Sequence, residues 1–128
     1  MKDLIIIGAG PIGLACGIEA TKNDLDYEII DKGVSGKYIF NYPVNTTFFS
    51  TSEKLEIGGI PFISHNVKPT RNEALEYYRR VCDSWEINLN LYNEVIEIMN
   101  KQSHFELKTQ NGIMNSEKVI ISTGFYDI

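Results

Sequence analysis

The sequence has few cysteines and histidines, and their spacing excludes two kinds of site. Cys16 and Cys82 lie far apart with no C-x-x-C spacing, so they indicate neither a disulfide framework nor a set of zinc ligands. His65 and His104 have no acidic or cysteine partners at ligand spacing, and we expect both at the surface. The sequence therefore predicts no metal site.

Basic residues are also not in excess, and there is no long apolar run. The formal net charge is −5 at pH 7, which provides no basic patch for nucleic acid or an anionic membrane surface. Glycine and proline interrupt the apolar run at the N-terminus too early for a signal peptide or a membrane span. We expect one globular domain over residues 1–128, located in the cytoplasm and bound to neither nucleic acid nor membrane.

The first stretch of the chain has the pattern of a strand, a glycine-rich turn and a helix. Residues 4–7 are apolar and mostly β-branched, which predicts a strand buried on both faces of a parallel sheet. Gly8, Gly10 and Gly13 follow with G-x-G-x-x-G spacing, and Pro11 suits the first turn of a helix. Gly8 would allow a tight turn, Gly10 the approach of a pyrophosphate, and Gly13 close packing of the helix on the strand. The free N–H groups of the first helical turn would then face the phosphates.

A second predicted strand, over residues 27–30, ends in Asp31. An acidic side chain at this place, about 20 residues beyond the glycines, usually holds a ribose 2′-OH. The alternative is a glycine-rich turn that binds nothing, and the agreement of strand, helix, strand and acid disfavours it. An acid in place of an arginine favours FAD or NAD over NADP.

Small residues share one face of the predicted first helix, which should end near residues 23–24. Gly13, Cys16, Gly17 and Ala20 lie on this face, which we expect to pack on the sheet. A cysteine near a helix N-terminus is either a thiol of low pKa or a structural residue. The inward direction of Cys16 favours a buried structural cysteine.

Residues 32–69 show no sustained helical or alternating period, and an irregular segment of this length is most often functional. It is rich in aromatic and hydroxyl side chains, which favours the pocket of a flat ring with polar edges. The alternative is a satellite core beneath the segment. The residues concerned are Tyr38, Phe40, Tyr42, Phe48, Phe49 and Phe62, with Thr46, Thr47, Ser50, Thr51 and Ser52.

A capping box at Thr70 and Glu73 predicts the start of a second helix, which runs to about Trp85. Apolar residues at spacings of three and four give this helix one buried stripe. The stripe consists of Ala74, Leu75, Tyr78, Val81, Cys82 and Trp85.

Short alternating segments follow the second helix. They predict a strand over 87–92, then a three-stranded antiparallel meander over 94–99, 104–109 and 113–114. An Asn-Gly pair favours a hairpin before the third strand of the meander. A final apolar run over 118–124 predicts a separate strand that returns beside the first one.

The order of these elements resembles the N-terminal part of the FAD domain in two-dinucleotide-binding flavoproteins. The glycine turn and Asp31 match its fingerprint, and the Ser-Thr-Gly at 122–124 is similar to its "ATG" motif. Longer runs look like the bacillithiol-disulfide reductase family, a thioredoxin-reductase-like group of low-GC Gram-positive bacteria. These runs are N-Y-P at 41–43, T-F-F-S-T-S-E-K-L-E-I-G at 47–58, I-P-F at 60–62, K-P-T-R-N-E-A-L at 68–75, Y-Y-R at 77–79 and T-G-F-Y-D at 123–127.

The resemblance implies an α/β, Rossmann-like FAD-binding domain with a parallel sheet, crossover helices and an antiparallel meander. Members of this family pass electrons from NADPH through FAD to the disulfide of a low-molecular-weight thiol. Some members carry a cysteine where this chain has Ile12, so thiol chemistry at that position is not transferred. No catalytic acid, base or nucleophile is assigned to this chain. The predicted FAD contacts are Gly8, Gly10, Pro11, Ile12, Gly13, Asp31, Lys32, Asn41, Thr47, Val95, Thr123 and Gly124.

The resemblance also implies parts that the 128 residues do not supply, namely an NADPH domain and a closing FAD segment. We therefore expect a fragment that does not turn over NADPH by itself. Two alternatives stay open: a flavin monooxygenase-like enzyme, and a dinucleotide-binding module without catalysis. An apolar sheet edge left by the missing domain would favour a homodimer.

Overall fold

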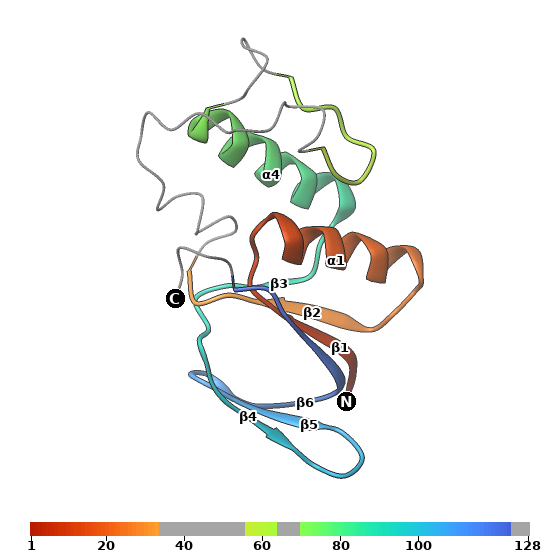
Figure 1. Ribbon diagram of the computed structural model, residues 1–128, viewed down its shortest axis with the longest axis vertical. Coiled ribbons are helices and arrows are strands. Elements are labelled where there is room, and N and C mark those ends of the chain that lie inside the picture. The colour runs from red at the N-terminus through yellow and green to blue at the C-terminus, as the bar shows by residue number, and fades with distance from the viewer. Residues whose placement is uncertain (34–55, 64–69, 124–128) are drawn as a thin grey trace.

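The computed structural model describes residues 1–33, 56–63 and 70–123. In these residues the chain forms a sheet of six strands and two helices (Figure 1). The elements are β1 (Lys2–Ile7), α1 (Pro11–Lys22), β2 (Tyr27–Ile30), α4 (Arg71–Trp85), β3 (Leu89–Asn90), β4 (Val95–Asn100), β5 (Phe105–Thr109) and β6 (Gly112–Ile121).

The strands follow the order β3-β2-β1-β6-β5-β4. The pairs β1–β2, β2–β3 and β1–β6 are parallel, while β4, β5 and β6 form an antiparallel meander. The predicted α/β class, the first two strands, both helices and the meander are therefore confirmed. The parallel return of the chain beside β1 is confirmed as well.

The last strand differs from the prediction, because one continuous strand replaces the two expected over 113–114 and 118–124. Ser116 pairs with Phe105 of β5 on one side and with Lys2 of β1 on the other. Its side chain is fully buried and donates a hydrogen bond to the carbonyl oxygen of Lys118 at 2.6 Å. Here β6 leaves the meander and joins the parallel strands, which unites both parts in one sheet.

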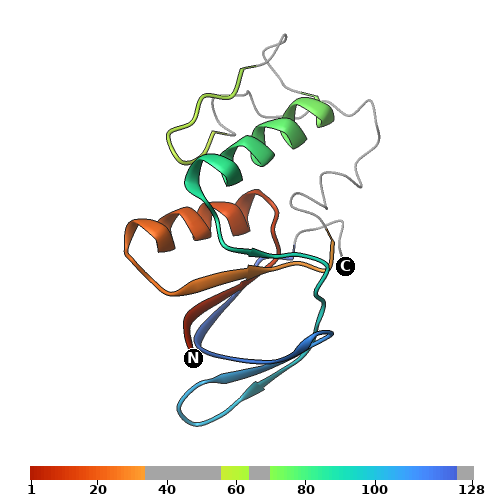
Figure 2. The same ribbon diagram turned by 180° about the vertical axis from the view of Figure 1, so that it is seen from behind.

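Along the long axis of the molecule α1 lies between α4 and the parallel strands, with the meander on the opposite side of those strands (Figures 1 and 2). Alternate residues of β1 serve the two sides: Leu4 and Ile6 pack with the helices, and Ile5 packs against Leu107 of the meander. This is the predicted burial on both faces. It anchors the carboxyl ends of β1 and β2 from two sides.

The capping box of α4 is confirmed. The Thr70 hydroxyl accepts from the backbone N–H of Glu73 at 3.3 Å, and the Glu73 carboxylate accepts from the N–H of Thr70 at 3.0 Å. The strand after α4 is shorter than predicted, because only residues 89–90 pair with β2. Left-handed backbone at Glu86 (φ 51°) and Tyr92 (φ 55°) ends the extended conformation on either side.

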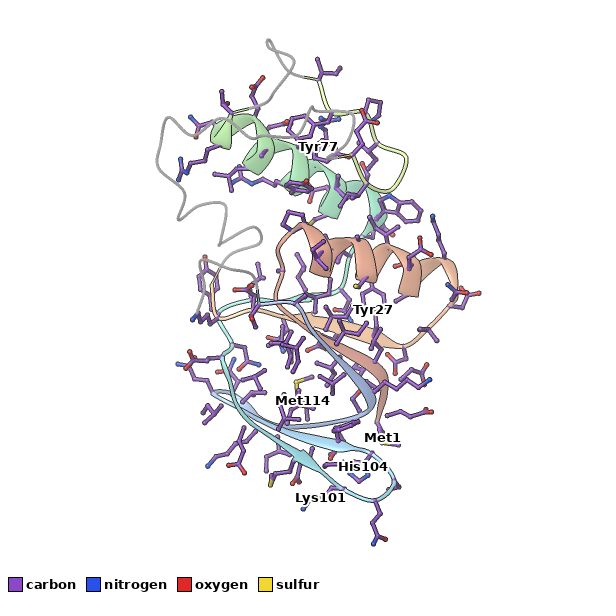
Figure 3. The ribbon with its side chains drawn as sticks, viewed as in Figure 1. Met1, Tyr27, Tyr77, Lys101, His104 and Met114 are labelled. Atoms are coloured by element: carbon purple, nitrogen blue, oxygen red, sulfur yellow. The ribbon has the colours of Figure 1, made fainter. Side chains whose placement is uncertain are left out.

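Among the aromatic residues predicted to line a ring pocket, Phe62 is described, and it follows the core alternative. Its ring stacks on that of Tyr77 with centroids 4.4 Å apart and meets Tyr78 edge-on. Tyr77, on α4 (Figure 3), was not among the residues predicted for the buried stripe of this helix, but it is fully buried. The other residues of the predicted pocket lie outside the described ranges, as does His65.

His104, expected at the surface, is half-buried, with its Nδ1 2.9 Å from the Ser103 hydroxyl.

In the described part of the chain, no helix has the length and apolar character needed to cross a membrane. Nor do three histidine, cysteine or acidic side chains cluster as metal ligands within these ranges.

Candidate functional site

A hollow of about 130 Å³ opens where β1 and β2 end. Open α/β sheets bind ligands at the carboxyl ends of their parallel strands, so its position is that of a binding site. Five of the predicted cofactor contacts lie in its wall, and the other four lining residues, Ile7, Ile30, Asn93 and Glu94, were not predicted as contacts. The full lining is Ile7, Gly8, Ile30, Asp31, Lys32, Asn93, Glu94, Val95 and Thr123.

The turn between β1 and α1 depends on the absence of two Cβ atoms. Gly8 has a φ of 109°, and a Cβ on it would collide with the carbonyl oxygen of Ser122 on the neighbouring strand end. A Cβ on Gly13 would collide with the carbonyl oxygen of Gly8 itself. The tight turn and the close approach of the helix, both predicted from the glycine spacing, are therefore confirmed.

Gly10 is the N-cap of α1, with φ −80° and ψ −174°. This is extended backbone that any residue adopts, so the turn itself does not require a glycine here. The first hydrogen bond of the helix is donated by Leu14 to the carbonyl oxygen of Gly10 at 2.9 Å. Because Pro11 has no N–H, the N–H groups of Ile12 and Gly13 precede this bond and are left for a ligand. The side chain of Ile12 is 67% exposed at this end.

Asp31 is buried, with 7% of its surface exposed, and the backbone orients both oxygens of its carboxylate. Oδ2 accepts from the N–H of Ala9 in the glycine turn, and Oδ1 accepts from the N–H of Gly33, each at 2.8 Å. A carboxylate oxygen has two acceptor sites, so each keeps capacity for a hydroxyl group. The acid and the glycine turn thus form one hydrogen-bonded unit.

The structure places the predicted contacts in two groups. Those that line the hollow are Gly8, Asp31, Lys32, Val95 and Thr123. Gly10, Pro11, Ile12 and Gly13 form the adjacent turn and first helical turn. Asn41, Thr47 and Gly124 lie outside the described residues.

Cys16 is half-buried, where the sequence predicted a buried residue. It lies at the edge of the α1 face, because Gly13 and Gly17 occupy the middle of the contact with the sheet. Burial raises the pKa of its thiol above the usual 9.0, which is opposite to the low-pKa alternative. Cys82 is buried in the core, as predicted.

The sequence profile of the pyridine nucleotide-disulphide oxidoreductase family matches residues 5–128. Bacilliredoxin reductase Bdr of Bacillus subtilis is 42% identical over 127 residues, which are 98% of this chain and 39% of that protein. The chain therefore spans about two fifths of the length of this relative.

Solved structures agree with the sequence match. Bacillithiol disulfide reductase Bdr from Staphylococcus aureus superposes with a TM-score of 0.94 at 40% identity, over 98% of this chain and 39% of that one. A flavin-containing monooxygenase from Stenotrophomonas maltophilia superposes with a TM-score of 0.89 at 23% identity, over 96% of this chain and 38% of that one, which shows a common fold. On this evidence the chain belongs to the pyridine nucleotide-disulphide oxidoreductase family.

Proposed function

We propose that this chain binds the adenosine diphosphate half of FAD in the hollow and forms the flavin-binding part of a disulfide reductase. The observation that carries the proposal is the buried Asp31 carboxylate, held by the glycine turn beside N–H groups that have no intrahelical partner. Similarity to reductases named for bacilliredoxin and bacillithiol disulfide supports a low-molecular-weight thiol disulfide as the substrate of the whole enzyme. A flavin monooxygenase has only fold-level similarity in its favour.

The described residues fit the proposed cofactor. A diphosphate needs N–H donors that it can approach closely, and Ile12 and Gly13 supply them at the positive end of a helix dipole. A ribose diol needs acceptors, and the Asp31 carboxylate supplies them. Val95 offers an apolar wall in the same hollow, as an adenine ring requires.

FAD, when bound, would supply the transfer of electrons from a nicotinamide to a disulfide. The contribution of this chain is to bind and orient. The α1 N-terminus holds the diphosphate, and Asp31 holds the sugar. The buried core under β1 keeps these groups at fixed positions. We assign no proton transfer to any residue of the described ranges.

NADPH is the proposed reductant of the whole reductase, and the match to the pyridine nucleotide-disulphide oxidoreductase family supports a nicotinamide nucleotide in this role. An enzyme that reduces thiol disulfides works in a reducing compartment, which supports the cytoplasm as its location. The homodimer stays a prediction.

Titration of the purified chain with FAD tests the proposal. We expect flavin fluorescence to change with a saturable profile, and no steady oxidation of NADPH by this chain alone. Replacing Asp31 with Asn should weaken FAD binding about tenfold or more, because hydrogen bonds to a charged group contribute about 1.5–3 kcal/mol. Mass spectrometry identifies any nucleotide that copurifies with the protein.

Asp24→Asn is the matched control, since it removes the same charge from an exposed residue after α1. It should leave FAD affinity unchanged. Thermal unfolding of both variants without ligand separates loss of binding from loss of fold. Failure of the wild-type chain to bind FAD, or equal affinity in Asp31→Asn, would contradict the assignment of the site.

A further inference from the structure

Asn93 lies beside Asp31 in the wall of the hollow, although the two are far apart in sequence. Its backbone N–H donates to the carbonyl oxygen of Asp31 at 2.9 Å. The preceding residue, Tyr92, has left-handed backbone with φ 55° and donates its N–H to the carbonyl oxygen of Gly33 at 3.2 Å. These two bonds hold the segment before β4 against the end of β2. Only 1% of the surface of Asn93 is exposed.

The orientation of the Asn93 amide follows from its partner. One atom of the amide lies 3.2 Å from the backbone N–H of Asn111, in the turn between β5 and β6. Because that N–H is a donor, the amide atom that faces it is the acceptor Oδ1. The other end of the amide is therefore the donor Nδ2. Among the described residues Nδ2 has no hydrogen-bond partner. In the described residues no side-chain nitrogen or oxygen that is sealed from solvent lacks a partner, so Nδ2 is open to the hollow that Asn93 lines, where it can donate to an acceptor on a ligand.

The charged groups around the hollow define what that acceptor can be. Asp31 and Glu94 are carboxylates in the lining, and Lys32 provides one ammonium group. The Asp31 carboxylate only accepts hydrogen bonds, whereas Nδ2 of Asn93 only donates them. A hydroxyl group does both, so an acceptor and a donor that line the same hollow are complementary to it.

We propose that Asn93 is a nucleotide-binding residue whose Nδ2 donates a hydrogen bond to a ribose hydroxyl oxygen, while a ribose hydroxyl donates a hydrogen bond to the Asp31 carboxylate. This inference rests on the proposed function and extends it, because it adds a hydrogen-bond donor, Asn93, to a ribose site in which Asp31 supplies only acceptors. The Asn93 amide is held by the β5–β6 turn. Binding of the sugar is therefore tied to the meander as well as to the glycine turn.

The test uses the whole chain and three probes: ADP, 2′-deoxy-ADP and 3′-deoxy-ADP, each titrated by calorimetry. The variant Asn93→Asp keeps an acceptor for the Asn111 N–H and removes the donor. We expect the wild type to prefer ADP over at least one deoxy nucleotide about tenfold, as for a hydroxyl that is bound by a charged acceptor and a donor. Asn93→Asp should reduce that preference by about threefold or more. Its affinity for ADP should fall more than its affinity for the deoxy nucleotide that lacks the bound hydroxyl.

Asn115→Asp, on the exposed side of β6, is the matched control for the added charge and should leave all three affinities unchanged. Equal loss of affinity for ADP and both deoxy nucleotides in Asn93→Asp would mean a structural role only, and would overturn this inference while the proposed function stands. Absence of ADP binding by the wild type would overturn both. If Asn93→Asp does not fold, the same cycle with Asn93→Ala decides, with the same loss of preference expected.

Discussion

In the turn between β1 and α1, backbone atoms approach so closely that there is no room for a side chain on Gly8 or Gly13, whereas residues 56–63 are held on α4 by side chains. A Cβ on Gly8 would overlap the carbonyl oxygen of Ser122, and a Cβ on Gly13 would overlap the carbonyl oxygen of Gly8. On α4, the Tyr77 hydroxyl accepts from the N–H of Ile57 at 2.8 Å and donates to the carbonyl oxygen of Ile60 at 2.7 Å. The indole N–H of Trp85 donates to the carbonyl oxygen of Gly58 at 3.1 Å.

This difference predicts how each region responds to change. Backbone cannot move aside without breaking the sheet or the helix, so the turn should tolerate no added carbon atom. Side-chain contacts can be removed one at a time, so the α4 region should lose stability in graded steps. The first region contributes Gly8 to the hollow, while Tyr77 of the second lies on α4, which α1 separates from the strands (Figure 3).

The largest effect should come from Gly13→Ala. The added Cβ would overlap the Gly8 carbonyl oxygen, so the helix must shift, and we expect a loss of about 3 kcal/mol or more in unfolding free energy together with loss of FAD binding. Urea denaturation and FAD titration measure both. The control is Gly59→Ala at φ 70°, which meets no atom and should cost only about 1–2 kcal/mol for its backbone conformation. An equal loss of unfolding free energy in Gly13→Ala and Gly59→Ala would contradict the view that the turn is intolerant because of its close backbone contacts.

Tyr77→Phe should have an intermediate effect. It removes the hydroxyl that serves both Ile57 and Ile60, and leaving their backbone groups unpaired should cost about 1–3 kcal/mol. FAD affinity should change little, because none of Tyr77, Ile57 and Ile60 lines the hollow. Tyr92→Phe, at a residue that is 66% exposed, is the control and should be neutral.

The same tyrosine makes a pH-dependent contribution. Burial is the main cause that raises the pKa of Tyr77 above its usual 10.0 in the folded state. The unfolded chain therefore loses this proton first, so stability is complete below pH 10.0 and falls as pH rises through the folded value. The fall should be shallower in Tyr77→Phe, and an identical pH profile for both proteins would contradict the burial argument.

The smallest effect should come from Thr70→Ala at the start of α4. It removes the hydroxyl that accepts from the Glu73 N–H, and we expect a loss of about 1 kcal/mol. Glu73→Gln keeps the hydrogen-bonding pattern of the capping box and is the control, with a smaller loss expected. Thermal unfolding measures both variants. A loss as large as that of Gly13→Ala would mean that α4 is as intolerant as the glycine turn.

Local signals were sufficient for much of this fold. The glycine spacing, the capping box at Thr70 and the apolar period of α4 each depend on residues within a turn or two of one another. They predicted β1, α1, the end of β2 at Asp31 and α4. The family resemblance added Lys32, Val95 and Thr123, which the structure places in the same hollow as Asp31.

Pairing between distant segments was the source of the errors. The continuity of β6 depends on Ser116, which has one partner in β1 and another in β5, and a single strand pattern does not contain that information. Phe62 joined the core because Tyr77 offered a ring to stack on. An aromatic residue in an irregular segment is compatible with either outcome.

The sequence alone determined the conformations that arise from near neighbours: where the glycines allow a turn, where a helix begins, and which acid ends β2. Only the tertiary structure decided that Asn93 and Asp31 share one hollow and that the β5–β6 turn orients the Asn93 amide. The reason is physical. Hydrogen bonds between remote segments depend on the order and register in which the strands pair, and these are properties of the whole sheet.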